Sequence, residues 1–205
     1  MSRVQQLLVE TWTPELRAAT RGDQVTPLEQ GMTRMLAHNP AVALAFVKLA
    51  GAVKMNRTIS ERLAEMMRLR IAFHNQCRSC MAIRYSEARG DGVDENLVCS
   101  LEKPQESKDL TPAEKVAVRY ADLMATDHLA IGDALYDELR EHYTEAQIVE
   151  LGVWCAMCTG FGRLAATWQM IDELPETFQG KGNERLAPWN SDFIEVGASG
   201  TAAVN

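Results

Sequence analysis

The chain has 205 residues, of which 46% are hydrophobic, and its formal net charge is -7. This length and composition suffice for one sizeable hydrophobic core. The acidic balance argues against nucleic acid or an anionic membrane surface as the main partner.

Localisation is predicted from the apolar stretches. The first twelve residues, MSRVQQLLVETW, contain too short an apolar run for a signal peptide. The longest weakly polar stretch, residues 151–161, is far below the roughly 20 residues that a membrane span needs. We therefore expect a soluble, cytoplasmic protein with no membrane partner.

The chain reads as a series of helices joined by short polar loops. Ser60 is suited to cap a helix start, and Thr111 with Glu114 has the spacing of a capping box. Thr144 and Gln147 form a second box, which opens a long apolar helix. No segment alternates with period two over a useful length, so we expect an all-α fold. The expected helices cover residues 4–10, 28–37, 40–54, 60–75, 78–89, 94–102, 112–125, 132–143 and 144–173.

The composition changes after Pro175, where Gly, Pro and polar residues become frequent. We expect residues 1–174 to form a single helical domain. Residues 175–205 are expected to form an irregular arm, partly disordered or docked on a neighbouring subunit. Trp12 and Trp189 would anchor the terminal arms on another subunit, or be buried within their own subunit.

The five cysteines point to redox or metal chemistry rather than to a structural disulfide framework. An odd count in a chain without a secretory signal argues against such a framework. Cys77 and Cys80 form a Cys-x-x-Cys pair near an expected helix start, where the helix dipole favours a thiolate. Such a thiolate attacks peroxides and disulfides.

The segment 65–84, EMMRLRIAFHNQCRSCMAIR, places further chemistry around this pair. The expected helices 60–75 and 78–89 should form an antiparallel hairpin that aligns Glu65, Arg84 and Cys80 along one seam. The alternative is that Glu65 is a surface acid paired with Arg62 or Arg68, three residues away on either side. Both interpretations stay open from spacing alone.

The same segment resembles the alkylhydroperoxidase D-like (AhpD-like) branch of the carboxymuconolactone decarboxylase family. The resemblance covers roughly residues 38–174. Within this range, three further stretches support it: ARGDGVDENLV, TPAEKVAVRYADLMA and YTEAQIVELGVWCAMCTGFGRLAATW. It implies an AhpD-like all-α fold in which a helical hairpin carries the Cys pair. It further implies a homo-oligomer, a trimer or a hexamer, that reduces hydroperoxides with electrons from a thiol or dithiol donor.

Site roles follow from this resemblance by position. Cys80 would be the peroxidatic thiol, Cys77 the resolving thiol and Glu65 the carboxylate of a proton relay. The family His four residues after the second Cys is Arg84 here, and Ser79 replaces another His of the best-known member. Arginine stays protonated and cannot relay a proton, so we expect Arg84 to stabilise the thiolate and to weaken peroxidase activity.

His74 is a candidate substitute for the missing relay His, or else a residue that packs the helix turn. No haem, flavin or nicotinamide motif is visible, so the expected cofactor is none beyond the Cys77–Cys80 dithiol. The methionines near the hairpin, Met66, Met67 and Met81, are expected in the core, with a pocket lining as the alternative.

Other functions were weighed against the thiol peroxidase. Lactone decarboxylation names the family, but that branch lacks the Cys pair. A non-catalytic, redox-sensing oligomer is the third reading. Cys155 and Cys158 would complete a four-cysteine zinc site with Cys77 and Cys80, but their spacing is wrong and they lie in an apolar helix. They are therefore expected to be core residues, and the site to hold no metal.

Overall fold

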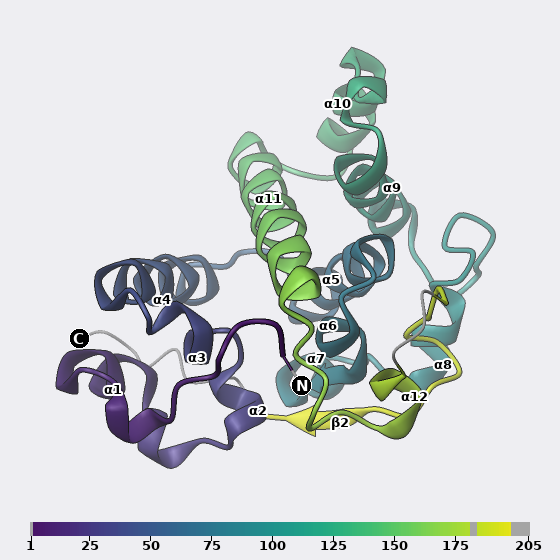
Figure 1. The fold of residues 1–205 in the computed structure, drawn as a ribbon. Coiled ribbons are helices and arrows are strands. Elements are labelled where there is room, and N and C mark those ends of the chain that lie inside the picture. Colours follow the sequence, from purple (N-terminus) through teal and green to yellow (C-terminus); the bar gives the residue numbers. More distant parts are fainter. Residues whose placement is uncertain (1, 181–183, 198–205) are drawn as a thin grey trace.

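A computed structural model describes residues 2–180 and 184–197 and shows a helical fold (Figure 1). Short 3-10 turns lie at Val9–Thr11, Gly22–Gln24 and His128–Ala130. The helices and strands are α1 (Pro14–Thr20), α2 (Pro27–Gln30), α3 (Thr33–Leu36), α4 (Pro40–Met55), α5 (Glu61–Asn75), α6 (Arg78–Ala82), β1 (Ile83–Tyr85), α7 (Ser86–Gly90), α8 (Glu95–Ser100), α9 (Pro112–Thr126), α10 (Asp133–Arg140), α11 (Glu145–Trp168), α12 (Glu176–Gln179) and β2 (Ile194–Val196).

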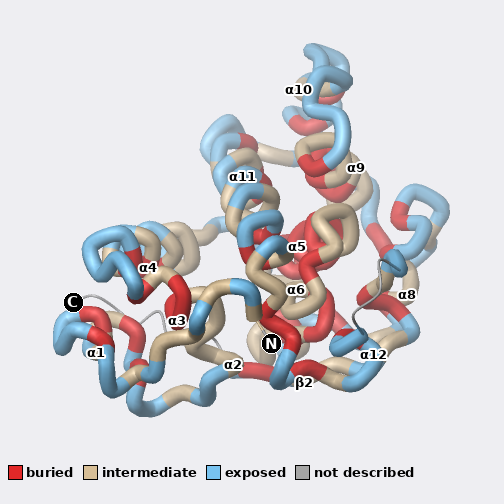
Figure 2. The backbone as a smooth tube through the Cα atoms, in the orientation of Figure 1, coloured by how far each residue is buried: buried red, intermediate tan, exposed pale blue. Residues whose placement is uncertain are grey.

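Helix α5 lies at the centre of the molecule and packs against α9 and α11. Figure 2 shows buried backbone concentrated along α5, whereas much of α10 is exposed. The three methionines near the redox motif, Met66, Met67 and Met81, are fully buried, which confirms that they are core residues. A second cluster around Trp12 and Leu16 joins the N-terminal segment to α4. Trp12 is therefore buried within its own chain.

The predicted helix starts are confirmed where the capping chemistry is local. The Ser60 hydroxyl accepts a hydrogen bond from the Leu63 N–H at 3.1 Å, at the start of α5. Both predicted capping boxes are present at the starts of α9 and α11. The predicted helix 28–37 is instead split into α2 and α3, because Gly31 ends α2 with a φ of +54°.

The predicted helix 78–89 is wrong, since α6 stops at Ala82 and a strand follows. In a continuous helix the N–H groups of residues 84 and 85 would bond the carbonyls of Cys80 and Met81. Here the Arg68 guanidinium bonds the Cys80 carbonyl, and the Arg84 guanidinium bonds the Met81 carbonyl at 2.7 Å. These side-chain donors release residues 83–85 to pair in parallel with β2, in the register Ile83↔Ile194.

The described part of the C-terminal arm packs on its own chain. The Gln76 side chain bonds both the N–H and the carbonyl of Leu186, at 2.8 and 3.1 Å. The ring centroid of Trp189 lies 4.5 Å from that of Phe73 on α5. The arm thus packs directly on the segment that carries the cysteines. The predicted disordered end, residues 198–205, lies outside the described residues.

Helix α11 changes one expectation about apolar stretches. Its 24 residues are long and apolar enough to cross a membrane by length and composition. The sequence predicted a shorter apolar stretch, residues 151–161. In the structure one side of α11 packs against α5 and α9, and 22% of its most apolar window is buried. Its outer side carries Val149 and Val153, which are 65% and 40% exposed.

Candidate functional site

A cavity of about 330 Å³ lies beside the redox motif. Cys80 and Ser79 of α6 line it, together with Glu65 and Arg68 of α5. The remainder of its wall is largely apolar and comes mainly from α4, α11 and residues 20–34. These apolar residues include Phe46, Val47, Ala50, Trp154, Met157 and Phe161. The predicted lining by Met66, Met67 or Met81 is not found, because these side chains face the core instead.

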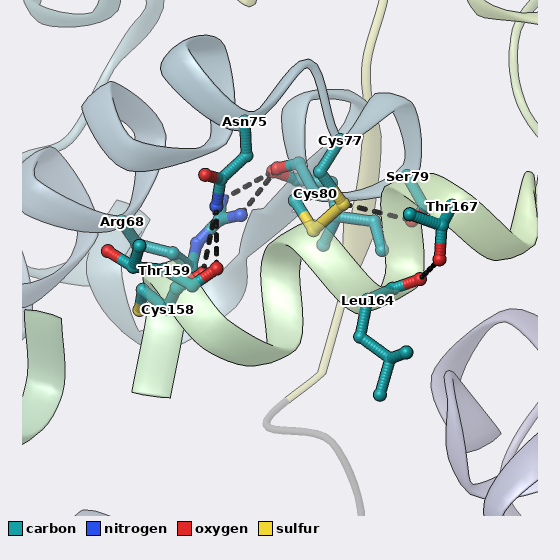
Figure 3. Close-up of a disulfide and its surroundings, with 10 residues drawn as sticks. Arg68, Asn75, Cys77, Ser79, Cys80, Cys158, Thr159, Leu164 and Thr167 are labelled. Atoms are coloured by element: carbon teal, nitrogen blue, oxygen red, sulfur yellow. Dashed lines mark hydrogen bonds between the residues drawn. A yellow bond between two sulfur atoms is a disulfide. The ribbon is translucent and has the colours of Figure 1, made fainter. Parts of the chain in front are cut away.

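The Cys-x-x-Cys pair forms a disulfide between Cys77 and Cys80, with Cα atoms 5.2 Å apart (Figure 3). Cys77 precedes the first residue of α6 and is fully buried. Cys80 is only partly buried and faces the cavity. A molecule in the cavity would therefore meet the sulfur of Cys80 first. The predicted help from a helix dipole is small, since α6 has five residues instead of the expected twelve.

Glu65 is buried and pairs with Arg68, one turn further along α5. The Nε and Nη2 atoms of Arg68 each donate to a different Glu65 oxygen at 2.6 Å. The same guanidinium donates to the carbonyl of Cys80 and, at 2.9 Å, to that of Ile83. Burial alone would lower the pKa of Arg68, but the Glu65 carboxylate outweighs it and raises that pKa. Arg68 thus stays charged and ties Glu65 to the backbone of Cys80.

The predicted contact between Glu65 and Arg84 is wrong. Arg84 lies on β1 and its side chain is fully buried. Its Nε and Nη2 atoms donate to Glu95 of α8 at 3.1 and 3.2 Å, and Nη2 also bonds the Pro188 carbonyl at 2.7 Å. Burial lowers the pKa of Arg84, and Glu95 opposes this effect. Arg84 joins β1 to α8 and the C-terminal arm, and its role as a stabiliser of the Cys80 thiolate stays a prediction.

His74 lies on the side of α5 that faces α9. Its Nε2 atom is 2.8 Å from an oxygen of Asp122, and Arg70 also donates to Asp122, at 2.8 and 3.0 Å. This network joins α5 to α9, and His74 does not line the cavity. The interpretation of His74 as a packing residue therefore fits the structure better than that of a substitute relay.

The second Cys pair has two different environments on α11. Cys155 is fully buried, and burial raises the pKa of its thiol well above the usual value. Cys158 lines the cavity, and burial is the main cause that raises its pKa to about 12. Sequence reasoning missed the place of Cys158 at the cavity. Its spacing from Trp154 and Phe161, which also line the cavity, was the available signal.

The cysteines do not assemble into the zinc site weighed from the sequence. Cys77 and Cys80 are joined to each other, and Cys99, Cys155 and Cys158 are free thiols. Within residues 2–180 and 184–197, no three His, Cys, Asp or Glu side chains are grouped so as to hold a metal ion.

Part of the chain is similar to known proteins. Residues 40–123 match the model of the carboxymuconolactone decarboxylase family. The uncharacterized protein YdfG of Bacillus subtilis (strain 168) is 30% identical over 95 residues, which are 46% of this chain and 65% of YdfG. The uncharacterized protein Rv2313c of Mycobacterium tuberculosis (strain ATCC 25618 / H37Rv) is 32% identical over 117 residues, 56% of this chain and 40% of that protein. The chain thus spans less than two thirds of these relatives.

Two solved structures share the fold. One is an alkylhydroperoxidase AhpD core, an uncharacterized peroxidase-related protein from Ralstonia eutropha JMP134, with a TM-score of 0.72 and 18% identity over 87% of this chain and 94% of that one. The other is the debrominase Bmp8 C82A in complex with 2,3,4-tribromopyrrole, with a TM-score of 0.58 and 22% identity over 73% of this chain and 88% of that one. At these identities they establish the AhpD-like fold and leave the reaction open.

Proposed function

We propose that this chain, whose residues 40–123 match the carboxymuconolactone decarboxylase family model, is a thiol-dependent oxidoreductase that reduces an uncharged, apolar hydroperoxide. One observation carries this proposal: the sulfur of Cys80 faces an apolar cavity, while Cys77 is fully buried behind it. This arrangement gives the two thiols different tasks, because only Cys80 meets a molecule that enters the cavity.

The charges of the cavity wall support an uncharged substrate. Each of the four basic residues among its described lining residues forms an ion pair with a glutamate. A substrate carboxylate would have to compete with these glutamates, whereas an apolar molecule can lie against the aromatic and aliphatic part of the wall and leave the ion pairs intact. The pairs are Arg34–Glu173 (2.7 Å), Lys54–Glu87 (3.1 Å), Arg57–Glu61 (2.6 Å) and Arg68–Glu65 (2.6 Å).

This balance also disfavours the alternative reaction of the family. A decarboxylase must bind the carboxylate that its substrate loses, and a buried carboxylate requires a positive partner. The cations at this cavity already have such partners. Thiol chemistry at Cys80 requires none of them to be released.

In the proposed reaction the Cys80 thiolate attacks one oxygen of the peroxide bond. A sulfur–oxygen bond forms, the oxygen–oxygen bond breaks, and the alkoxide leaves and takes up a proton to become an alcohol. The Cys77 thiol then attacks the Cys80 sulfenic acid, forms the Cys77–Cys80 disulfide and releases water. The two thiols supply both electrons, and an external thiol donor must restore them.

Glu65 and Arg68 act on this reaction through position rather than proton transfer. Both oxygens of Glu65 accept hydrogen bonds from Arg68, so the carboxylate is held as the partner of a cation. Arg68 in turn holds the carbonyl of Cys80. We propose that the pair fixes Cys80 at the cavity wall.

Steady-state turnover of cumene hydroperoxide with a dithiol reductant tests the proposal. Cys80→Ser should abolish turnover, and Ala50→Trp should raise KM for cumene hydroperoxide more than for hydrogen peroxide, because Ala50 lines the cavity. Ala134→Trp, on the exposed side of α10, is the matched control. A Cys80→Ser variant that turns over peroxide like the parent would overturn the proposal.

The same assay also tests whether the ion pairs at the cavity wall disfavour a negatively charged substrate. A hydroperoxide of similar size that carries a carboxylate should be reduced more slowly than cumene hydroperoxide. Equal rates would mean that the ion pairs at the cavity wall do not select the substrate. Binding of 2,3,4-tribromopyrrole, the ligand in the debrominase complex, is measured alongside as an apolar aromatic probe without a peroxide bond.

A further inference from the structure

Reduction of a hydroperoxide at Cys80 releases an alkoxide, and this strong base needs a proton donor inside the cavity. Both oxygens of Glu65 accept hydrogen bonds from Arg68, so this carboxylate has no proton to give. Neither Arg84 nor His74 is among the described residues that line the cavity. The donor must therefore be sought among the other side chains of the cavity wall.

The change from helix to strand after Ala82 decides which side chains reach the cavity. Successive side chains of a strand point to opposite sides. Arg84 is fully buried, whereas its neighbours Ile83 and Tyr85 are only partly buried. Ile83 and Tyr85 both line the cavity. Strand β1 therefore turns the guanidinium of Arg84 away from the cavity and places the ring of Tyr85 at its wall.

Tyr85 lies close to the redox segment because both contact Arg68. The guanidinium carbon of Arg68 is 5.1 Å from the centroid of the Tyr85 ring. The same guanidinium donates hydrogen bonds to the carbonyls of Cys80 and Ile83. A cation at this distance would also stabilise the phenolate that remains after the Tyr85 hydroxyl has given up its proton.

The other protons at the cavity wall are less available. Ser79 carries an aliphatic hydroxyl, which is a far weaker acid than a phenol. Burial is the main cause that raises the pKa of Cys158 to about 12, above the roughly 10 of an ordinary phenol. The ammonium group of Lys54 forms an ion pair with Glu87 at 3.1 Å. Among the described lining residues, the phenol of Tyr85 is thus the uncharged group best able to donate a proton.

We propose that the Tyr85 hydroxyl is the general acid of this site. The proposal rests on the proposed function and adds a catalytic residue to it. The Cys80 thiolate attacks the terminal peroxide oxygen, so that a sulfur–oxygen bond forms and the oxygen–oxygen bond breaks. Tyr85 gives its proton to the leaving alkoxide, which becomes an alcohol, while Cys80 becomes a sulfenic acid. The phenolate then regains a proton from water before the next turnover.

Two oxidants that differ in the basicity of their leaving groups test this role. Cumene hydroperoxide releases an alkoxide, which needs a proton, whereas perbenzoic acid releases benzoate, which needs none. Both carry one benzene ring. The rate of Cys80 oxidation in the reduced full-length protein is measured in a single turnover by acid quenching, alkylation and mass spectrometry. Tyr85→Phe keeps the ring and removes the hydroxyl, so it should slow the reaction with cumene hydroperoxide about 100-fold and leave that with perbenzoic acid unchanged.

Tyr143→Phe is the matched control, since it removes a phenol outside the cavity. The Tyr143 hydroxyl donates to the Ala113 carbonyl at 2.9 Å, and Tyr143 is not among the described lining residues. This variant should react like the parent with both oxidants. Structural damage in Tyr85→Phe would slow both oxidants alike. An equal loss with the two oxidants, or no loss with either, would therefore overturn the proposal.

The same measurements separate this inference from the proposed function. A parent protein whose Cys80 reacts with neither oxidant would overturn both. If the parent reacts with both and Tyr85→Phe keeps its rate with cumene hydroperoxide, the proposed function is supported and Tyr85 has no part in the reaction.

Discussion

The ion pair between Glu65 and Arg68 provides the sharpest test of the site's architecture. The side chains of Arg68 and Glu65 are only 9% and 3% exposed. Replacing Arg68 by Met would leave the Glu65 carboxylate buried without its cation and the Cys80 carbonyl without its donor. Breaking a buried pair in this way costs about 3–5 kcal/mol. For a chain of this length, that corresponds to a melting temperature lower by about 6–20 °C.

The assay is thermal unfolding at one fixed protein concentration, followed by circular dichroism. Glu65→Leu combined with Arg68→Met removes both charges, so this double variant should be more stable than Arg68→Met alone. The control is Arg119→Met, which breaks an exposed pair with Glu138 and should cost less than about 1 kcal/mol. If Arg68→Met and Arg119→Met lower the melting temperature equally, the pair of Glu65 and Arg68 is not buried as described.

Four further predictions concern Arg84, the thiols of Cys155 and Cys158, the pH dependence of stability and the assembly. Arg84→Met should increase hydrogen exchange in residues 186–196, because it removes the contact to Pro188. In a Cys77→Ser background, the same substitution should leave the pH profile of Cys80 alkylation unchanged. A shifted profile would show that Arg84 acts on the Cys80 thiol. Cys155 and Cys158 should resist iodoacetamide at pH 7.5 in the folded protein, since burial raises both pKa values; rapid labelling there would contradict the described burial. Because the folded pKa of Cys158 is raised, its contribution to stability should be complete below pH 9 and be lost as the pH rises toward 12, which urea unfolding across this range measures. Finally, the exposed apolar side of α11 supports the proposed homo-oligomer, so light scattering should give a trimer or a hexamer, and a monomer at micromolar concentration would refute it.

The features predicted correctly from the sequence were those fixed by neighbouring residues. Capping at Ser60, Thr111 and Thr144 depends on side chains within three residues, so spacing alone was sufficient. The redox pair at Cys77 and Cys80 was likewise a local pattern. The helical fold expected from the resemblance is confirmed by the solved AhpD core, which shares it with a TM-score of 0.72.

The errors arose where distant residues decide the local structure. Helical periodicity continued through residues 83–85, but Arg68 and Arg84 bond the carbonyls that would have extended α6. The partner strand for these residues comes from positions 194–196, more than a hundred residues later. The partner of Glu65 was ambiguous for the same reason, since both a neighbour on α5 and a residue across the turn had suitable spacing. In the structure Glu65 pairs with Arg68, and Arg84 bonds Glu95 of α8 and the Pro188 carbonyl instead.

The most direct test of the central claim is to trap the first product of Cys80. The Cys77→Ser variant, reduced and then treated with one equivalent of cumene hydroperoxide and dimedone, should gain one dimedone adduct per chain. Peptide mapping should place it on Cys80, which faces the cavity, and the Cys80→Ser variant should gain none at Cys77, which is buried. An adduct on Cys77 in the Cys80→Ser variant, or none on Cys80 in the Cys77→Ser variant, would contradict the account.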